Sequence, residues 1–177
     1  MRRIVTGHTD SGKEAVLADD EVPAVTTAIQ PGVTVHRVWE LDRTPTLPVT
    51  EVPETHLGPM FPDPGGLRFG FISIAAGVSY ELPADLTPEA IGAAAAEAEQ
   101  KLPGMAAAFD RSRPGMHTTH SADFIVVVSG EGRMRTDDGT EVRLRPGDCV
   151  VQNGTAHVWL NDGDEPFVFA YSLAGAR

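Results

Sequence analysis

The sequence has one cysteine, few basic residues and no long apolar run, and each shortage excludes a class of protein. A single cysteine, Cys149, allows no disulfide within the chain and fits a reducing compartment. The 14 lysines and arginines are outnumbered by 25 aspartates and glutamates, which gives a net charge of −11. Nucleic acids and anionic membranes require a basic surface, so neither is expected as a partner. No stretch approaches the roughly 20 apolar residues of a membrane helix.

The N-terminal segment is not expected to be a signal peptide, because no apolar core follows Arg2 and Arg3. We therefore expect a soluble, cytoplasmic protein. Its 177 residues fit one domain, residues 1–177, with enough length for a substantial core. Cys149 lies in an apolar run and is expected to be a buried, inert thiol rather than a nucleophile.

Turn-forming residues are abundant, since 18 glycines and 14 prolines punctuate the chain. Between them lie short runs rich in β-branched and aromatic residues, which favour strands. From Asp123 onward these runs recur at intervals of about 8–12 residues, a spacing typical of a β-sandwich or barrel. The expected strands cover residues 125–128, 133–135, 142–144, 149–151, 157–161 and 167–173. Residues 125–128 are apolar on both faces, so both faces of that strand are expected to be covered.

The first half of the chain divides into an arm and a loop. Residues 1–50 contain short extended pieces, and 33–41 is the clearest strand among them. Alternation within it places Trp39 on the same face as Arg37. Residues 43–66 are rich in proline and glycine, so they are expected to form a surface loop or lid rather than a central strand.

A strand at residues 67–75, continued to about residue 80, is followed by an expected helix at about 87–102. Thr87 suits the N-cap, Pro88 the first helical position, and an alanine-rich stretch follows. Pro103 and Gly104 end the helix.

Two motifs joined by a hairpin carry the functional signal. In the first, His117 is followed by Asp123 and by a closing glycine, Gly130. In the second, His157 is followed at the fourth position by an asparagine, Asn161, and two glycines precede it, Gly147 and Gly154. The order and spacing resemble those of the cupin family. The resemblance implies an all-β fold: a jelly-roll cupin barrel over residues 67–175, with an N-terminal arm of short strands and one or two helices. It also implies a homodimer.

The resemblance further implies a metal site, from which this sequence departs at two positions. Cupins typically hold a divalent transition metal with three histidines and a glutamate, but here Thr119 replaces the second histidine and Asp123 the glutamate. Because residues i and i+2 of a strand share a face, His117 and Thr119 are expected to point inward and His120 outward. The predicted metal ligands are therefore His117, Asp123 and His157, holding Fe, Mn, Ni or Zn. The predicted pocket residues are Thr119 and Trp159. Phe124, Phe169 and Tyr171 are expected to be core residues, of which one or two can line the pocket.

Two functions remain open at this point. One is a metal-dependent enzyme of the oxygenase, isomerase or decarboxylase kind that acts on a small organic molecule, with His120 or His56 as the catalytic proton donor or acceptor. The other is a metal-free cupin that binds a small molecule, or acts as an acid/base cyclase or epimerase. In that case His117 and His157 form the hydrogen-bonding or proton-transfer pair.

Overall fold

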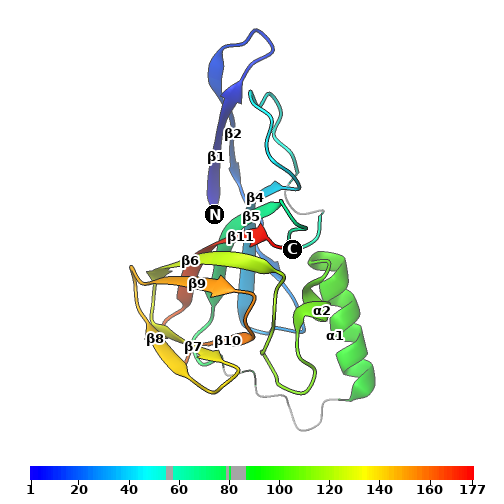
Figure 1. Cartoon of the computed structure of the whole chain (residues 1–177), viewed down its shortest axis with the longest axis vertical. Coiled ribbons are helices and arrows are strands. Elements are labelled where there is room, and N and C mark those ends of the chain that lie inside the picture. The colour runs from blue at the N-terminus through cyan, green and yellow to red at the C-terminus, as the bar shows by residue number, and fades with distance from the viewer. Residues whose placement is uncertain (55–57, 79, 81–86) are drawn as a thin grey trace.

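The computed structural model describes residues 1–54, 58–78, 80 and 87–177 (Figure 1). Most of its regular elements are strands, as the sequence predicted. The strands are β1 (Arg2–His8), β2 (Glu14–Glu21), β3 (Val25–Thr26), β4 (Val33–Leu41), β5 (Leu67–Ile74), β6 (Ser121–Ser129), β7 (Gly132–Thr136), β8 (Glu141–Leu144), β9 (Cys149–Asn153), β10 (His157–Leu160) and β11 (Phe167–Gly175). Two helices complete the set, α1 (Pro88–Lys101) and α2 (Met105–Ala108).

Two antiparallel sheets enclose the core. The larger has the strand order β3-β4-β5-β11-β6-β9 and the smaller has the order β10-β7-β8. Ile74 and Phe169 from the larger sheet meet Met134 and Trp159 from the smaller one, and all four are buried. The all-β, jelly-roll expectation is therefore confirmed, and the functional motifs lie on β6 and β10 at the inner faces of the two sheets.

The N-terminal strands form a hairpin that projects away from these sheets (Figure 1). Within the described residues, β1 and β2 pair only with each other, and Arg2 and Arg3 form ion pairs with Asp19 and Asp20 across the hairpin. The loop after β4 runs beside the hairpin, and the amide of His8 donates a hydrogen bond of 2.8 Å to the carbonyl of Val49. The arm is thus attached to the Pro/Gly-rich loop.

The predicted helix at 87–102 is confirmed as α1. The hydroxyl of Thr87 accepts a hydrogen bond from the amide of Ala90, and Pro88 occupies the first turn, as expected for an N-terminus. Gly104, at φ 86°, turns the chain into the short helix α2, which buries Met105. None of the described helices has the length and apolar character needed to cross a membrane.

The outer face of β6 and β9 corrects three expectations. Ile125 and Val127 are buried, but Val126 and Val128 are exposed, so only one face of this strand is covered by the protein itself. Phe124, expected in the core, is 52% exposed on the same outer face. Cys149 pairs with Val126 in register and is likewise exposed rather than buried. The apolar character of these residues therefore has no explanation in the core of a single chain.

The register of β4 and the end of β5 also differ from expectation. The register of β4 against β5 shifts between Arg37 and Trp39, so Trp39 does not share the inner face with Arg37. The shift turns Glu40 inward, where it forms an ion pair of 2.6 Å with Arg37. β5 ends at Ile74, instead of continuing to about residue 80.

Candidate functional site

The fold brings the histidines of the two motifs together. The amide of His117 donates to the carbonyl of His157, and the amide of His157 donates to the carbonyl of His117, both at 3.0 Å. Their ring centroids lie 4.2 Å apart. His157 opens β10, whereas His117 lies just before β6 and is held by this bridge. Side-chain direction predicted the pairing correctly, although His117 itself is not in a strand.

Each imidazole uses one nitrogen to contact the backbone. Nδ1 of His117 lies 3.1 Å from the carbonyl oxygen of Gly115, and Nδ1 of His157 lies 2.8 Å from that of Thr155. A carbonyl oxygen can only accept, so these hydrogen bonds place the proton on Nδ1 of each neutral ring. Nε2 of each ring is left with its lone pair free to accept from a ligand.

Asp123 is a buried carboxylate supported by two hydroxyls. Ser121 donates to its Oδ1 at 2.5 Å and Thr119 to its Oδ2 at 3.2 Å. Burial raises the pKa of Asp123, and these hydroxyls together with His157 act in the opposite direction. Thr119, which replaces a histidine of the usual motif, therefore serves here as a donor to the carboxylate. Ser121, two residues before Asp123 on the same face, was missed by sequence reasoning, although that spacing was a usable signal.

Burial keeps both imidazoles neutral near pH 7. Burial, together with the neighbouring His157 and against the hydrogen bond to Gly115, lowers the pKa of His117 to about 3. Burial also lowers the pKa of His157, against the bond to Thr155 and the charge of Asp123. The pair therefore presents hydrogen-bond acceptors, not cations.

A cavity of about 60 Å³ lies between the two sheets, and all five residues predicted as ligands or pocket residues line it. Aromatic rings pack against the histidines. The ring centroids of Phe109 and His117 lie 5.2 Å apart, and those of Trp159 and His157 lie 5.4 Å apart with an angle of 82° between the ring planes. The cavity is also lined by residues that the motifs did not indicate, Gln30, Met60, Phe61, Tyr80, Met105 and Phe109. These come from the arm, the Pro/Gly-rich loop, the segment after β5 and the helical segment, where no motif marks an inward side chain.

The two histidines predicted to be catalytic are not placed at the cavity. His120 is exposed and is not among the lining residues, although its backbone carbonyl accepts from the amide of Ala176. His56 falls outside the described residues.

Comparison with known proteins identifies the family of the segment that carries both motifs. Residues 110–173 match the family model described as Cupin domain, and this segment contains both motifs and their connecting hairpin. Residues 110–173 therefore form a cupin domain.

Relatives of this cupin match it over short segments. A cupin-domain-containing oxidoreductase, fogC, of Aspergillus ruber is 46% identical over 46 residues, which are 26% of this chain and 23% of that protein. Oryzines biosynthesis cluster protein J of Aspergillus oryzae is 36% identical over 61 residues, 34% of each chain. Among solved structures, a Cupin 2 conserved barrel domain protein of Salinispora arenicola aligns over 89% of this chain and 90% of its own, with 16% identity and a TM-score of 0.45. The matched segments thus span about a quarter to a third of the curated relatives.

Cupins often bind metals, and a metal ion needs several donor side chains that point at one place. Among the described residues, no group of three or more His, Cys, Asp or Glu side chains is arranged to hold a metal ion. Asp123 is occupied by two hydroxyl donors, and Thr119 supplies no imidazole. The described side chains fit an imidazole pair with a neighbouring carboxylate, and they do not fit a three-ligand metal centre.

Proposed function

We propose that this cupin binds a small organic molecule between its sheets and transfers a proton on it, in the manner of a metal-free cyclase or epimerase. The observation that carries the proposal is the state of the two imidazoles. Both bond to backbone carbonyls through Nδ1 and line the cavity, so Nε2 is the ring nitrogen that each can offer to a ligand there. Neutral imidazole in a largely apolar pocket suits acid/base chemistry on an uncharged substrate.

His157 and His117 have different roles in this proposal. The charge of Asp123 favours the protonated form of His157, which makes His157 the better proton acceptor. Asp123 then stabilises the imidazolium while its own charge is held by Thr119 and Ser121. His117, with a pKa of about 3, is a weak base and instead accepts a hydrogen bond that orients the substrate.

The names of relatives support a small organic substrate and nothing narrower. Oryzines biosynthesis cluster protein J and phomopsin biosynthesis cluster protein C' are both named for biosynthesis clusters. The oxidoreductase name of fogC belongs to a protein of which only 23% is matched, so that reaction is not transferred.

The metal roles predicted for His117, Asp123 and His157 stay predictions. One observation favours them, because a metal-bound imidazole also donates its other N–H to a carbonyl, as both rings do here. Elemental analysis of protein purified without a histidine tag distinguishes the two functions. If the proposed function is right, we expect no stoichiometric transition metal. A bound ion that is lost in both His117→Ala and His157→Ala would instead support the metal-dependent function.

Proton transfer is testable with phenylacetone, a small neutral ketone, in deuterated buffer. In the expected reaction, a proton moves from the benzylic carbon to Nε2 of His157, the electron pair forms the enolate, and a deuteron returns from the same nitrogen. His157→Gln is expected to slow this exchange by about 100-fold, the lower range for loss of a general base. Proton NMR follows the exchange.

The matched control is His120→Gln, which changes an exposed histidine near the same motif and is expected to leave the rate unchanged. Full exchange activity in His157→Gln would contradict the proposal. Loss of exchange on chelation, with recovery on adding Zn²⁺ or Mn²⁺, would support the metal-dependent function instead.

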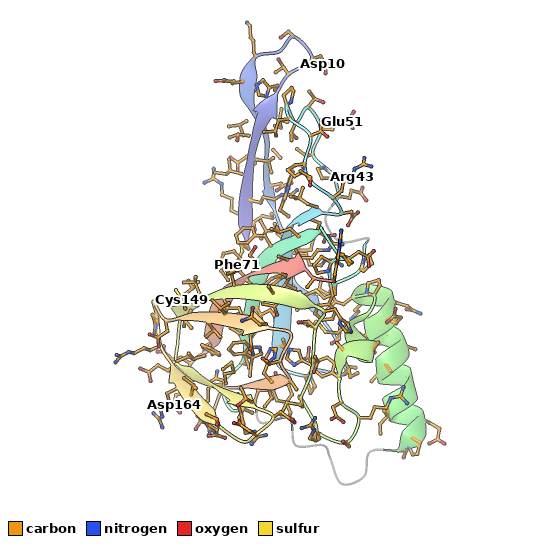
Figure 2. All side chains as sticks on the ribbon, in the orientation of Figure 1. Asp10, Arg43, Glu51, Phe71, Cys149 and Asp164 are labelled. Atoms are coloured by element: carbon orange, nitrogen blue, oxygen red, sulfur yellow. The ribbon has the colours of Figure 1, made fainter. Side chains whose placement is uncertain are left out.

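We also propose that two copies pair through the outer face of the larger sheet. Two rows of residues cross five strands there without a charged side chain. They follow the strand register as Val151–Phe124–Ser172–Phe69–Trp39 and Cys149–Val126–Ala170–Phe71–His36. Phe71 and Cys149 are labelled in Figure 2. Phe124, Val126 and Val151 are 52%, 44% and 57% exposed, and an exposed apolar face of this kind marks an interface.

A second copy of this chain is the partner that the charge pattern favours. The chain carries a net charge of −11, so two copies repel each other wherever acidic residues meet. A face without charge avoids that repulsion, and a self-complementary face suits a two-fold dimer. This supports the homodimer that the resemblance implied.

Val126→Asp is expected to weaken the dimer at least tenfold, because it buries a carboxylate in an apolar interface. Val142→Asp is the matched control, since Val142 is 42% exposed on β8 of the other sheet. Sedimentation velocity measures both variants and the parent protein. A parent protein that stays monomeric at about 100 μM, or equal dissociation in both variants, would contradict the interface.

A further inference from the structure

The cavity beside the histidine pair is smaller than an aromatic ring requires. Its volume is about 60 Å³. Apolar cavities that bind benzene have a volume of about 150 Å³, so a ring of that size needs more space than this cavity offers. A molecule with a large apolar substituent can therefore enter only if some of the side chains that line the cavity move.

Most of the lining is fixed by the fold. The lining residues of the larger sheet lie on β4, β5, β6 and β11, and these strands pair with one another in register. The aromatic lining residues pack on each other, since the ring centroids of Trp159 and Phe169 lie 4.8 Å apart. Side chains held in this way have little space for another conformation in a close-packed interior.

Two methionines form the adaptable part of the lining. Met60 comes from the Pro/Gly-rich loop and Met105 from α2, and they are 2% and 5% exposed. The amide of Met60 donates to the carbonyl of Pro103 at 2.8 Å, so the loop is joined to the turn before α2. Methionine is unbranched and has three rotatable bonds, so its side chain can change shape where a β-branched one cannot.

Two buried arginines hold the backbone next to Met60. Arg37 donates to the carbonyls of Gly58 and Pro59, at 2.8 and 3.1 Å. Arg68 donates to the carbonyl of Pro59 at 3.0 Å, and both arginines are 3% exposed. Hydrogen bonds from buried charged groups are strong and costly to break. A ligand therefore displaces the side chain of Met60 more readily than the loop that carries it.

We propose that Met60 is a specificity-determining residue, which sets the size of the substrate because its side chain occupies space that the apolar part of a larger substrate needs. The substrate class is a neutral carbonyl compound with an apolar substituent that takes the place of this side chain. Acetone, the smallest ketone, needs the least displacement of Met60, and phenylacetone needs more. This inference rests on the proposed function, because it concerns the substrate of the same site.

The role of Met60 is tested by comparing phenylacetone with acetone in the deuterium-exchange experiment. The readout is the ratio of kcat/KM for phenylacetone to that for acetone, because a loss of folded protein changes both values alike. Met60→Ala is expected to raise this ratio about tenfold, the lower range of the cost of forcing extra atoms into a filled site. Met60→Ile is expected to lower it about tenfold, because isoleucine has a similar volume but a stiff side chain.

Leu144→Ala is the matched control for these variants. Leu144 is 5% exposed in the same core and is not among the described residues that line the cavity. Its truncation is therefore expected to leave the ratio unchanged. Equal ratios in the parent protein and in both Met60 variants would overturn the inference, and so would an equal rise in Leu144→Ala.

Benzene binding separates this inference from the proposed function. Benzene has no acidic proton and no polar group, so its affinity reports the space in the cavity and not the chemistry. Met60→Ala is expected to bind benzene at least tenfold more tightly than the parent protein, as detected by the ring-nitrogen signals of His157. Equal affinities would overturn the inference. If neither ketone exchanges but benzene binding differs as expected, the proposed function fails and the role of Met60 stands.

Discussion

Asn161→Ala is expected to lower the free energy of unfolding by about 3–5 kcal/mol, because several buried backbone groups would lose their partner together. Asn161 is fully buried, and its Nδ2 lies within 2.8–3.1 Å of the carbonyls of Ile74, Ala75 and Glu165. Its Oδ1 accepts from the amide of Gly163 at 3.0 Å. This asparagine therefore joins the end of β5 to the turn between β10 and β11. Urea unfolding followed by circular dichroism measures the change.

Asn153→Ala is the matched control, because Asn153 is exposed at the end of β9. That variant is expected to stay within about 0.5 kcal/mol of the parent protein. A loss of less than about 1 kcal/mol in Asn161→Ala would show that the motif asparagine does not hold these loops together.

Acidification is expected to destabilise the protein through the histidine pair. The pKa of His117 is lowered from 6.5 to about 3 in the folded state, so below pH 6.5 the unfolded chain binds a proton that the folded chain excludes. Stability therefore falls as the pH is lowered from 6.5 toward 3. Between pH 6.5 and pH 4 we expect a loss of about 2–3 kcal/mol from His117, the lower figure allowing for partial exposure of the residue.

Asp123 has the opposite effect on the pH dependence of stability within part of the range between pH 6.5 and pH 4. Its pKa is raised in the folded state, so its contribution is present below 3.8 and is lost as the pH rises through the folded value. Comparing variants isolates the histidine. His117→Gln is expected to flatten the stability profile between pH 6.5 and pH 4, whereas His120→Gln is expected to leave it unchanged. Parallel profiles for His117→Gln and the parent protein would show that burial does not hold this ring neutral.

Alternation along strands predicted which side chains of the candidate site share one face. It placed His117, Thr119, Asp123, His157 and Trp159 on one side, and the structure gathers all five around one cavity. The rule worked because the segments near these residues are extended and antiparallel, so a parity argument survives even where a residue lies just outside a strand.

Alternation along strands could not predict an interface with a second copy, a shift of register or the partners of a buried hydroxyl. An apolar Val126 is equally compatible with a buried face and with an interface, and sequence periodicity does not distinguish the two. The register shift after Arg37 has no sequence signal, so Trp39 was assigned to the wrong face. Tyr171 was placed in the core correctly, but the missing partner of its hydroxyl depends on the three-dimensional arrangement of its neighbours.

Nitrogen-15 NMR of the two imidazoles, recorded between pH 5 and pH 8, tests the central claim most directly. For His117 we predict a neutral ring across this range, and for both rings at pH 8 we predict the proton on Nδ1 and an unprotonated Nε2. The rings can be assigned by comparing His117→Gln and His157→Gln with the parent protein. A ring that titrates near pH 6.5, or that carries its proton on Nε2, would contradict a buried pair whose Nε2 atoms accept from a ligand.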